Sequence, residues 1–411
     1  MGINKKLTGN ILSLFTLKGA EYIVSFITLP YLLRVLGPEY FGMIVFAQTL
    51  MNYGNLLVDY GFNLTAPRDV AKADAGALPK EFSSILGTKV LLLLFTCLLG
   101  GVGFALFSDY LNLILLACVF PTLLGNAIFP VWYFQGMQQM RFITLFNIVA
   151  RIISVAGIFI FVNEPDDYCL AAFLQSVVPL VAGIISIGML ISTSRDLFLL
   201  PDKHMVWQKL VDGWEIFLST VFINFYTNSN IFILRILTND ICVGYYAAAS
   251  KLIEAVKGLL MPISNAIFPH VSVLVKESRE KAIAFLCKAM RVIGGFSLFI
   301  SFGVFVFTEP IVHLIMGNSY EESIEILRII SFLPFIIGLS NVFGIQTMVT
   351  FGMQKLFSRI LMASALLNFV LVIPFIYLWE GIGLAIAVVC VESFVTVTMY
   401  VMLRRHGIAI R

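Results

Sequence analysis

The chain has 411 residues, of which 59% are hydrophobic and 12% are charged, and its formal net charge is +3. Its mean hydropathy is +0.95, whereas soluble domains are typically about 45 to 50% apolar and about 25% charged. This composition excludes an ordinary water-soluble protein and indicates an integral membrane protein.

A helix that crosses the hydrocarbon needs about 20 mostly apolar residues, because every backbone N–H and C=O must be paired within the segment. Apolar stretches between polar or turn-rich breaks therefore predict the spans. We expect an all-α polytopic membrane protein with twelve transmembrane helices. In chain order, the expected spans are 11–34, 41–60, 84–107, 111–134, 142–162, 169–192, 213–237, 243–265, 289–308, 325–350, 357–378 and 382–403.

The connections between the spans differ in charge, and cationic loops stay on the cytoplasmic side. One side collects the basic residues Lys5, Lys6, Arg68, Lys72, Lys80, Lys89, Arg141, Arg195, Lys203, Lys209, Lys276, Arg279, Lys281, Lys288, Arg291, Lys355, Arg359, Arg404, Arg405 and Arg411. The other side carries Glu39, Asp109, Glu164, Asp166, Asp167, Asp240, Glu309, Glu321, Glu322 and Glu380. Both termini are therefore expected in the cytoplasm.

The N-terminus resembles a signal peptide, because two lysines precede an apolar run. The run is too long and no small-residue cleavage site follows it, so we expect it to be retained as the first span. The six cysteines are scattered without a CxxC pair, and we interpret them as free thiols that serve as small apolar residues. The sequence predicts neither a metal site nor a cofactor.

The sequence repeats itself after about half its length. The stretch "YLLRVLGPEYFG" at 31–42 returns as "FILRILTNDICVG" at 232–244, and with a shift of 202 Gly42 meets Gly244. The same shift places "NLTAP" (63–67) on "NAIFP" (265–269), and a shift of 216 places Gly136-Met137-Gln138 on Gly352-Met353-Gln354. Three echoes in order indicate duplication of a six-helix unit.

Because six is even, both copies have the same topology, an arrangement found in transporters whose substrate site lies between the halves. We expect an N-terminal lobe at 1–192, a cytoplasmic connection at 193–212 and a C-terminal lobe at 213–411. The apolar and basic residues of the connection are typical of an amphipathic segment on the membrane surface. A plain linker is the alternative.

Polar residues line one face of several spans. At about 100° per residue, Gln48, Asn52, Asn55 and Asp59 fall within an arc of about 60°. Lys18 and Glu21 in the first span, Asn224 and Asn228 in the seventh, and Lys251, Glu254 and Lys257 in the eighth continue this pattern in both copies.

A charge at mid-bilayer costs about 2.5 to 3.5 kcal/mol on insertion scales, so buried charges face a partner or a wet cavity. We expect a hydrated, partly cationic cavity between the halves, in which lysines and Arg151 attract an anionic head group such as a phosphate. The expected substrate-binding residues are Lys18, Glu21, Asn52, Asn55, Asp59, Arg151, Asn224, Asn228, Lys251, Glu254 and Lys257. The alternative is that Lys18 with Glu21, and Lys251 and Lys257 with Glu254, are ion pairs in packed protein.

Four other ionisable residues stand apart from this set. Arg34 points about 160° away from the Lys18 stripe, by the helical repeat of about 100° per residue, and we expect it to reach the head groups. Arg235 shares the stripe of its helix and is a further candidate ligand. Glu392 and His313 are isolated in the sequence pattern, which favours a structural role over proton coupling.

Enzymatic functions find no support in the motifs. The chain has no GxxxxGK[ST] phosphate loop, no HExxH and no long extramembrane stretch, and its longest outer connection is 309–324. A polysaccharide polymerase or ligase would need a large periplasmic loop with a basic or catalytic cluster. We therefore expect a transporter, and no nucleic-acid partner.

Five stretches carry a family resemblance, namely "LPYLLRVLGPEYFGMIVFAQTL", "DYGFNLTAPRDVA", "WYFQGMQQM", "VGYYAAASKLIEAV" and "FGMQK". In this order they resemble the polysaccharide repeat-unit flippases (Wzx-type, O-antigen transporters) of the multidrug/oligosaccharidyl-lipid/polysaccharide exporter superfamily. The resemblance covers nearly the whole chain. It implies two six-helix lobes in a bacterial inner membrane, with membrane lipids around them.

The resemblance also implies the substrate, an undecaprenyl-pyrophosphate-linked oligosaccharide that moves to the periplasmic leaflet by alternating access. Cationic cavity residues would hold the pyrophosphate, in agreement with Lys18, Lys251, Lys257 and Arg151, although this chain has lysine where arginine is expected. A polysaccharide polymerase and a chain-length regulator are further candidate partners. The rival functions are a drug or cation exporter, whose cavity should be acidic or aromatic, and a flippase of peptidoglycan precursor, which typically has two more spans.

Overall fold

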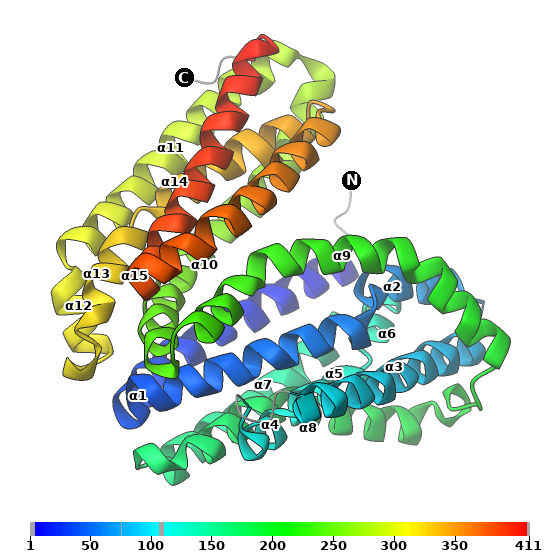
Figure 1. Ribbon diagram of the computed structural model, residues 1–411. Helices are drawn as coiled ribbons and strands as arrows, with labels where there is room; N and C mark the ends of the chain where they lie inside the picture. Colours follow the sequence, from blue (N-terminus) through cyan, green and yellow to red (C-terminus); the bar gives the residue numbers. More distant parts are fainter. Residues whose placement is uncertain (1–4, 75, 107–110, 409–411) are drawn as a thin grey trace. The chain divides into compact units, whose positions relative to one another are not determined.

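The structure is a computed structural model that describes residues 5–74, 76–106 and 111–408. The described residues form helices and no strand. They divide into two compact units (Figure 1). Unit 1 comprises Met1–Leu36 and Ile44–Phe225, and unit 2 comprises Gly37–Met43 and Tyr226–Arg411.

The helices follow one another with short connections. Those that begin in unit 1 are α1 (Lys5–Asp59), α2 (Phe62–Lys72), α3 (Leu78–Leu106), α4 (Leu113–Val119), α5 (Pro121–Ile128), α6 (Val131–Gly136), α7 (Met140–Phe161), α8 (Tyr168–Thr193) and α9 (Lys203–Leu237). Unit 2 continues with α10 (Asp240–Glu277), α11 (Arg279–Val306), α12 (Thr308–Ile315), α13 (Glu322–Ile330), α14 (Leu333–Asn341), the π-helix η5 (Val342–Val349) and α15 (Gln354–Arg405). The chain enters unit 2 briefly at Gly37–Met43 of α1 and passes into it again within α9.

Two of these helices contain a backbone break. In α1, Gly37 has φ 71° and ψ 175°, a conformation that favours glycine because a Cβ is strained there. Pro38 then begins the next helical stretch, where its fixed φ suits a first turn. In α15 the break lies at Trp379 and Glu380. Both breaks fall where the sequence predicts a connection between spans.

Eight helical segments among the described residues are long and apolar enough to cross a membrane. They are Phe26–Lys72, Leu78–Leu106, Leu113–Gly136, Met140–Phe161, Pro165–Thr193, Arg279–Val306, Glu322–Val349 and Gln354–Arg405. The first and last contain the breaks described above. The expected spans 213–237 and 243–265 fall on α9 and α10, some of whose side chains lie outside the description.

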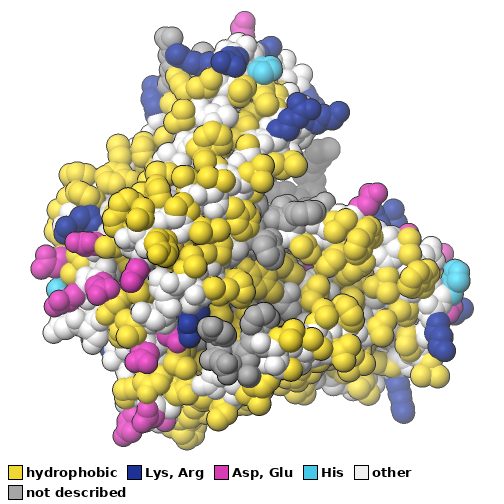
Figure 2. Space-filling view, in the orientation of Figure 1, with side chains coloured by type: hydrophobic (Ala, Val, Ile, Leu, Met, Phe, Trp, Pro, Cys, Tyr) yellow, Lys and Arg dark blue, Asp and Glu magenta, His cyan; other side chains and the backbone are white. Residues whose placement is uncertain are grey.

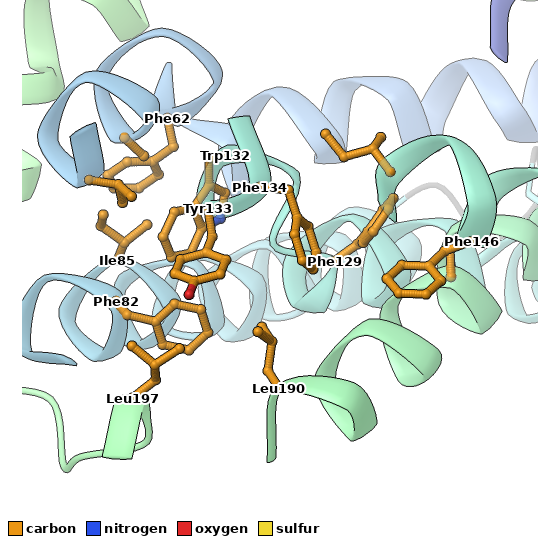
Figure 3. Packing of buried hydrophobic residues seen from close by; sticks show 14 of the residues in the cluster. Phe62, Phe82, Ile85, Phe129, Trp132, Tyr133, Phe134, Phe146, Leu190 and Leu197 are labelled. Atoms are coloured by element: carbon orange, nitrogen blue, oxygen red, sulfur yellow. The ribbon is translucent and has the colours of Figure 1, made fainter. Parts of the chain in front are cut away.

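The core of unit 1 is aromatic at the end where α2, α3 and α6 meet (Figure 3). The Phe82 ring lies 5.3 Å from those of both Trp132 and Tyr133, edge-on to the latter. Such edge-on pairs contribute about 0.5 to 1.5 kcal/mol beyond area burial. Leu197, from the connection after α8, completes this cluster. The cluster therefore fixes the helices that carry the charged groups described below.

The connection 193–212 packs on unit 1. The Ser83 hydroxyl of α3 donates to the Leu197 carbonyl at 2.7 Å and accepts from the Leu199 N–H at 2.8 Å. The Tyr60 hydroxyl donates to the Leu210 carbonyl at 3.0 Å. Leu200 and Trp207, by contrast, are exposed. The segment is thus anchored by its backbone while it presents apolar side chains outward.

In unit 2, α10, α11, η5 and α15 enclose a second core. Val271, Leu286, Val342 and Met399 are fully or almost fully buried in it. Acidic side chains gather at the end of this unit formed by α12 and α13, and basic ones at the end near the C-terminus of α15 (Figure 2). The two ends of unit 2 therefore differ in charge as the sequence predicts.

The helical stretch after Gly37 crosses the start of α10 at two glycines. A Cβ on Gly42 would collide with the Asp240 carbonyl oxygen, and a Cβ on Gly244 would collide with the Pro38 carbonyl oxygen. The contact is reciprocal under the shift of 202, because that shift carries Gly42 to Gly244 and Pro38 to Asp240. Only glycine allows the two backbones to approach this closely.

The third sequence echo is wrong in register. After α6, Gln138 has φ 55°, and the Gln139 N–H donates to the Phe134 carbonyl at 2.7 Å. After η5, Gly352 has φ 80°, and the Met353 N–H donates to the Met348 carbonyl at 2.7 Å. These helix ends correspond with a shift of 214 instead of 216.

The physical reason for the slip is that the two glycines serve different needs. Gly352 supplies the left-handed residue that ends a helix. Gly136 lies two residues before the corresponding position, where a Cβ would meet Val70 and the Pro67 carbonyl of α2. The shared Gly-Met-Gln triplet therefore marks equivalent helix ends without marking equivalent positions.

Candidate substrate site

The polar stripe of α1 is largely engaged within unit 1. The Asp59 carboxylate accepts a hydrogen bond from the Asn63 amide at 2.6 Å, and the Lys89 ammonium of α3 lies 3.6 Å from Asp59 Oδ1. The Lys89 side chain is only 4% exposed. Lys89, one of the basic residues expected toward the cytoplasmic side, is thus buried against Asp59 rather than exposed in a loop.

The rest of that stripe is less completely satisfied. Gln48 donates to the Gln175 side-chain carbonyl of α8 at 3.4 Å. Asn52 is exposed. Asn55 is half-buried, and its side-chain oxygen has no hydrogen-bond partner among the described residues. The middle of the stripe thus keeps a buried acceptor that no described residue satisfies.

Of the five other predicted site residues in the first nine helices, the structure describes the side chains of two. Arg151 lies half-buried in α7. Asn224 of α9 donates its amide to the Thr220 carbonyl at 2.9 Å, one turn earlier. The predicted site residues Lys18, Glu21 and Asn228 lie outside the described side chains.

In unit 2, the charges of α10 are balanced by carboxylates. The Lys251 ammonium lies 3.1 Å from the Glu254 carboxylate, and the two side chains are 48% and 54% exposed. Lys257 is half-buried, and its charge acts on Glu392 of α15. The sequence pattern suggested that Glu392 is isolated. The structure shows instead that the charge of Lys257 acts on it. The two lysines and Glu254 of α10, together with Glu392 of α15, therefore carry little net charge.

The residues set apart in the sequence are also resolved. Arg235 forms an ion pair with Asp240 at the start of α10, which supplies a structural role for this candidate ligand. Arg34 is exposed, as expected for a side chain that reaches the head groups. His313 lies 3.1 Å from the Asn318 side-chain oxygen in the turn after α12.

A family comparison covers most of this chain. The model of the family described as "Polysaccharide biosynthesis protein" matches residues 7–275. A protein named "Putative O-antigen transporter" from Escherichia coli (strain K12) is 35% identical over 418 residues and spans 100% of both chains. The chain belongs to the polysaccharide biosynthesis protein family. A relative of the same name from Shigella dysenteriae is 30% identical over 398 residues and covers 95% of this chain and 98% of its own.

Solved structures share the fold of this polysaccharide biosynthesis protein. The lipid II flippase MurJ, in an inward closed conformation, has a TM-score of 0.73 and 13% identity, and the match covers 96% of this chain and 87% of that one. An inward-facing multidrug resistance MATE family transporter of the MOP superfamily has a TM-score of 0.66 and 13% identity, with 94% and 98% covered. At this identity the likeness concerns the fold alone.

Sequence reasoning missed a charged cluster in unit 1. Lys209, at the start of α9, lies 2.7 Å from Asp69 of α2 and 2.8 Å from Glu81 of α3. Its neighbours Arg68, Lys72 and Asp212 help to line a cavity of about 370 Å³. Burial alone would lower the pKa of Lys209, but its hydrogen bonds to Asp69 and Glu81 outweigh burial and raise that pKa above its ordinary value.

This cluster joins three helices whose order in the sequence gives no hint of their contact. Lys209 and Asp69 lie 140 positions apart in the sequence. From the sequence, Lys209 is predicted to be an exposed charge in a connection between spans. Nothing in the local pattern indicates that two carboxylates are its partners. The arrangement is that of a structural clamp, because the carboxylates already satisfy Lys209.

Proposed function

We propose that this protein is a flippase that moves an undecaprenyl-pyrophosphate-linked oligosaccharide, the repeat unit of O-antigen or a related surface polysaccharide, to the periplasmic leaflet by alternating access. The observation that carries the proposal is the 35% identity, over 100% of both chains, to the protein named "Putative O-antigen transporter" from Escherichia coli (strain K12). A fold shared with a lipid II flippase supports it.

We infer twelve spans in two six-helix lobes. Division of two of the eight candidate segments at their breaks adds two spans, and α9 and α10 supply two more. The reciprocal contact of Gly42 and Gly244 supports duplication, because a self-complementary contact is typical of two copies related by two-fold symmetry. The lobes expected at 1–192 and 213–411, joined by 193–212, remain part of this proposal.

The proposed location is a bacterial inner membrane with both termini in the cytoplasm. Basic residues of unit 2 gather near the end of α15 and acidic ones around α12 and α13 (Figure 2). This polarity supports the orientation by the positive-inside rule. A polymerase and a chain-length regulator are partners that fit such a flippase, which itself needs no catalytic residue and no cofactor.

The proposed pyrophosphate ligands are Lys251 and Lys257, and Asn52 and Asn55 belong to the same proposed substrate-binding set. Lys251 is available because its ion pair with Glu254 is half exposed, and an exposed pair contributes only about 0 to 1 kcal/mol. A pyrophosphate can therefore compete for the lysine at little cost. Lys18, Glu21, Asp59, Arg151, Asn224 and Asn228 complete the proposed cavity set.

A flippase of peptidoglycan lipid precursor is a second candidate, favoured by the TM-score of 0.73 to the lipid II flippase. Both candidates move a sugar on a polyprenyl pyrophosphate, so the lysines would serve either. They differ in phenotype. Loss of a peptidoglycan flippase stops cell-wall growth, whereas loss of a polysaccharide flippase removes one surface glycan.

The deciding experiment is a strain deleted for the gene. We expect loss of one surface polysaccharide, accumulation of its lipid-linked repeat unit in the cytoplasmic leaflet, and restoration of both by the wild-type gene. A strain that keeps every surface glycan and instead becomes sensitive to drugs would contradict the proposal and favour the drug exporter. Arrested wall synthesis would favour the second candidate.

A further inference from the structure

Unit 2 contains a cavity of about 290 Å³ at its acidic end. It lies where the start of α10, helix α13 and the break of α15 meet. The polar lining comes from Cys242, Glu322 and Glu380, and the aromatic lining from Tyr245 and Trp379. None of these residues belongs to the predicted substrate set.

A tight turn in α15 builds one wall of the cavity. Glu380 has φ 49° and ψ −124°, a conformation that costs a residue with a Cβ about 1 to 3 kcal/mol and persists only where the surroundings enforce it. Helix packing enforces it here, because a Cβ on Gly383 would collide with the Phe375 carbonyl oxygen. The turn holds the Glu380 carboxylate and the Trp379 ring beside each other at the cavity.

The remaining walls are fixed by hydrogen bonds. The Cys242 thiol, which precedes the expected span, donates to Glu380 Oε2 at 2.9 Å. Burial and the Glu380 carboxylate raise the pKa of Cys242 to about 12, so the thiol stays protonated as a donor. The Ser323 hydroxyl of α13 donates to the Tyr245 carbonyl at 3.0 Å. The lining is therefore held in place before any ligand arrives.

The lining chemistry suits a sugar ring. Ionised carboxylates only accept hydrogen bonds, and sugar hydroxyls are donors. Aromatic rings and the apolar side chains of Ile326 and Leu378 offer a surface for the C–H face of a ring. Ligand pockets usually begin at about 300 Å³, so this cavity accommodates one ring and excludes a whole oligosaccharide.

A bare metal ion does not fit the same lining. No group of three or more His, Cys, Asp or Glu side chains that could hold a metal occurs among the residues that the structure describes. One oxygen of Glu380 already accepts from the thiol. Two carboxylates and two rings also suit an organic ammonium, which the experiment below must separate from a sugar.

We propose that this cavity binds one sugar ring of the glycan on the outer side of the membrane, an inference that rests on the proposed flippase function. The acidic end of unit 2 is the periplasmic end under the proposed orientation. A weak site there would hold the repeat unit after it has crossed. It would thereby disfavour return of the glycan to the inner leaflet.

The probe is the repeat-unit oligosaccharide, released from the source strain's lipid carrier and labelled with a fluorophore. The test measures its binding to the purified full-length protein in nanodiscs. We expect Trp379→Ala to bind about tenfold more weakly, the cost of one lost anchor contact. The double variant Glu322→Gln/Glu380→Gln should show a similar loss. Trp379→Phe, which keeps a ring, should remain within about threefold of wild type by the same scale.

Two matched control residues do not line the cavity. Tyr377 is 83% exposed, two positions before Trp379, and Glu309 is an exposed carboxylate at the start of α12. Tyr377→Ala and Glu309→Gln should bind as wild type does. Equal binding by wild type, Trp379→Ala and the glutamate double variant would overturn the proposal.

Two further outcomes complete the test. Displacement of the oligosaccharide by millimolar choline, but not by free glucose, would assign the cavity to an organic cation and overturn the proposal. Complementation of the deletion strain is scored separately. If wild type restores the surface polysaccharide while cavity variants bind normally, the sugar site alone fails; if wild type does not restore it, the flippase function fails.

Discussion

Two ion pairs of similar chemistry have different surroundings. In unit 1, Lys89 pairs with Asp59 and is 4% exposed. In unit 2, Lys251 pairs with Glu254 and is 48% exposed. The first lysine joins α3 to α1, whereas the second joins two turns of the same helix.

The difference teaches which lysine can bind a substrate. A buried charge that loses its partner is left uncompensated, so the pair is held together by the cost of separation. In the hydrated cavity that we propose, a half-exposed pair is screened, and either charge can exchange partners at little cost. Burial, more than charge, therefore separates structural lysines from candidate ligands in this protein.

The largest expected effect follows from removal of the buried lysine. Lys89→Met leaves Asp59 without its cationic partner and should destabilise the protein by about 3 to 5 kcal/mol, measured as folded yield and thermal unfolding in detergent. Addition of Asp59→Asn should recover much of the loss, because it removes the stranded charge. Lys80→Met, at an exposed lysine of the same helix, is the control; equal stability of Lys80→Met and Lys89→Met would contradict the comparison.

An intermediate effect is expected at Lys209, which is 14% exposed. Lys209→Met removes two charge-assisted hydrogen bonds and should cost about 1.5 to 3 kcal/mol, seen in thermal unfolding. Because the pKa of Lys209 is raised in the folded state, its contribution should be complete below the ordinary lysine pKa and disappear as the pH rises through the raised value. A difference between wild type and Lys209→Met that persists unchanged at very alkaline pH would rule out this clamp.

The smallest effect on stability is expected at the exposed pair. Lys251→Gln should change the unfolding free energy by no more than about 1 kcal/mol, yet it should reduce surface glycan sharply if Lys251 binds the pyrophosphate. Immunoblots of surface polysaccharide, normalised to the amount of inserted protein, provide the measurement. Normal glycan in both Lys251→Gln and Lys257→Gln would remove these lysines from the site.

Much of the helical pattern can be predicted from sequence. The apolar stretches give most helix positions, and Gly37 marks the first break because its backbone requires a positive φ. The family resemblance is also confirmed, by the match over residues 7–275 and by the full-length relatives. These features depend on local composition and on residue order, which a sequence shows directly.

The partners of polar residues could not be predicted in the same way. Glu392 meets the charge of Lys257 from another helix, and Lys209 meets Asp69 and Glu81 from two others. Helical periodicity places a residue on a face, but packing decides what that face meets. The two-residue slip between Gly136 and Gly352 has the same origin, because identical residues meet different demands of packing and backbone conformation.

The crossing of Gly42 and Gly244 has an evolutionary consequence. If the ancestral gene encoded one half that paired with an identical chain, a single codon specified both sides of this contact. Under this proposed duplication, each glycine would rest on a carbonyl from the other copy, so neither could change while the rest of the two halves diverged. A saturation library should therefore tolerate no replacement at either codon, because a Cβ at either position would collide with a backbone carbonyl.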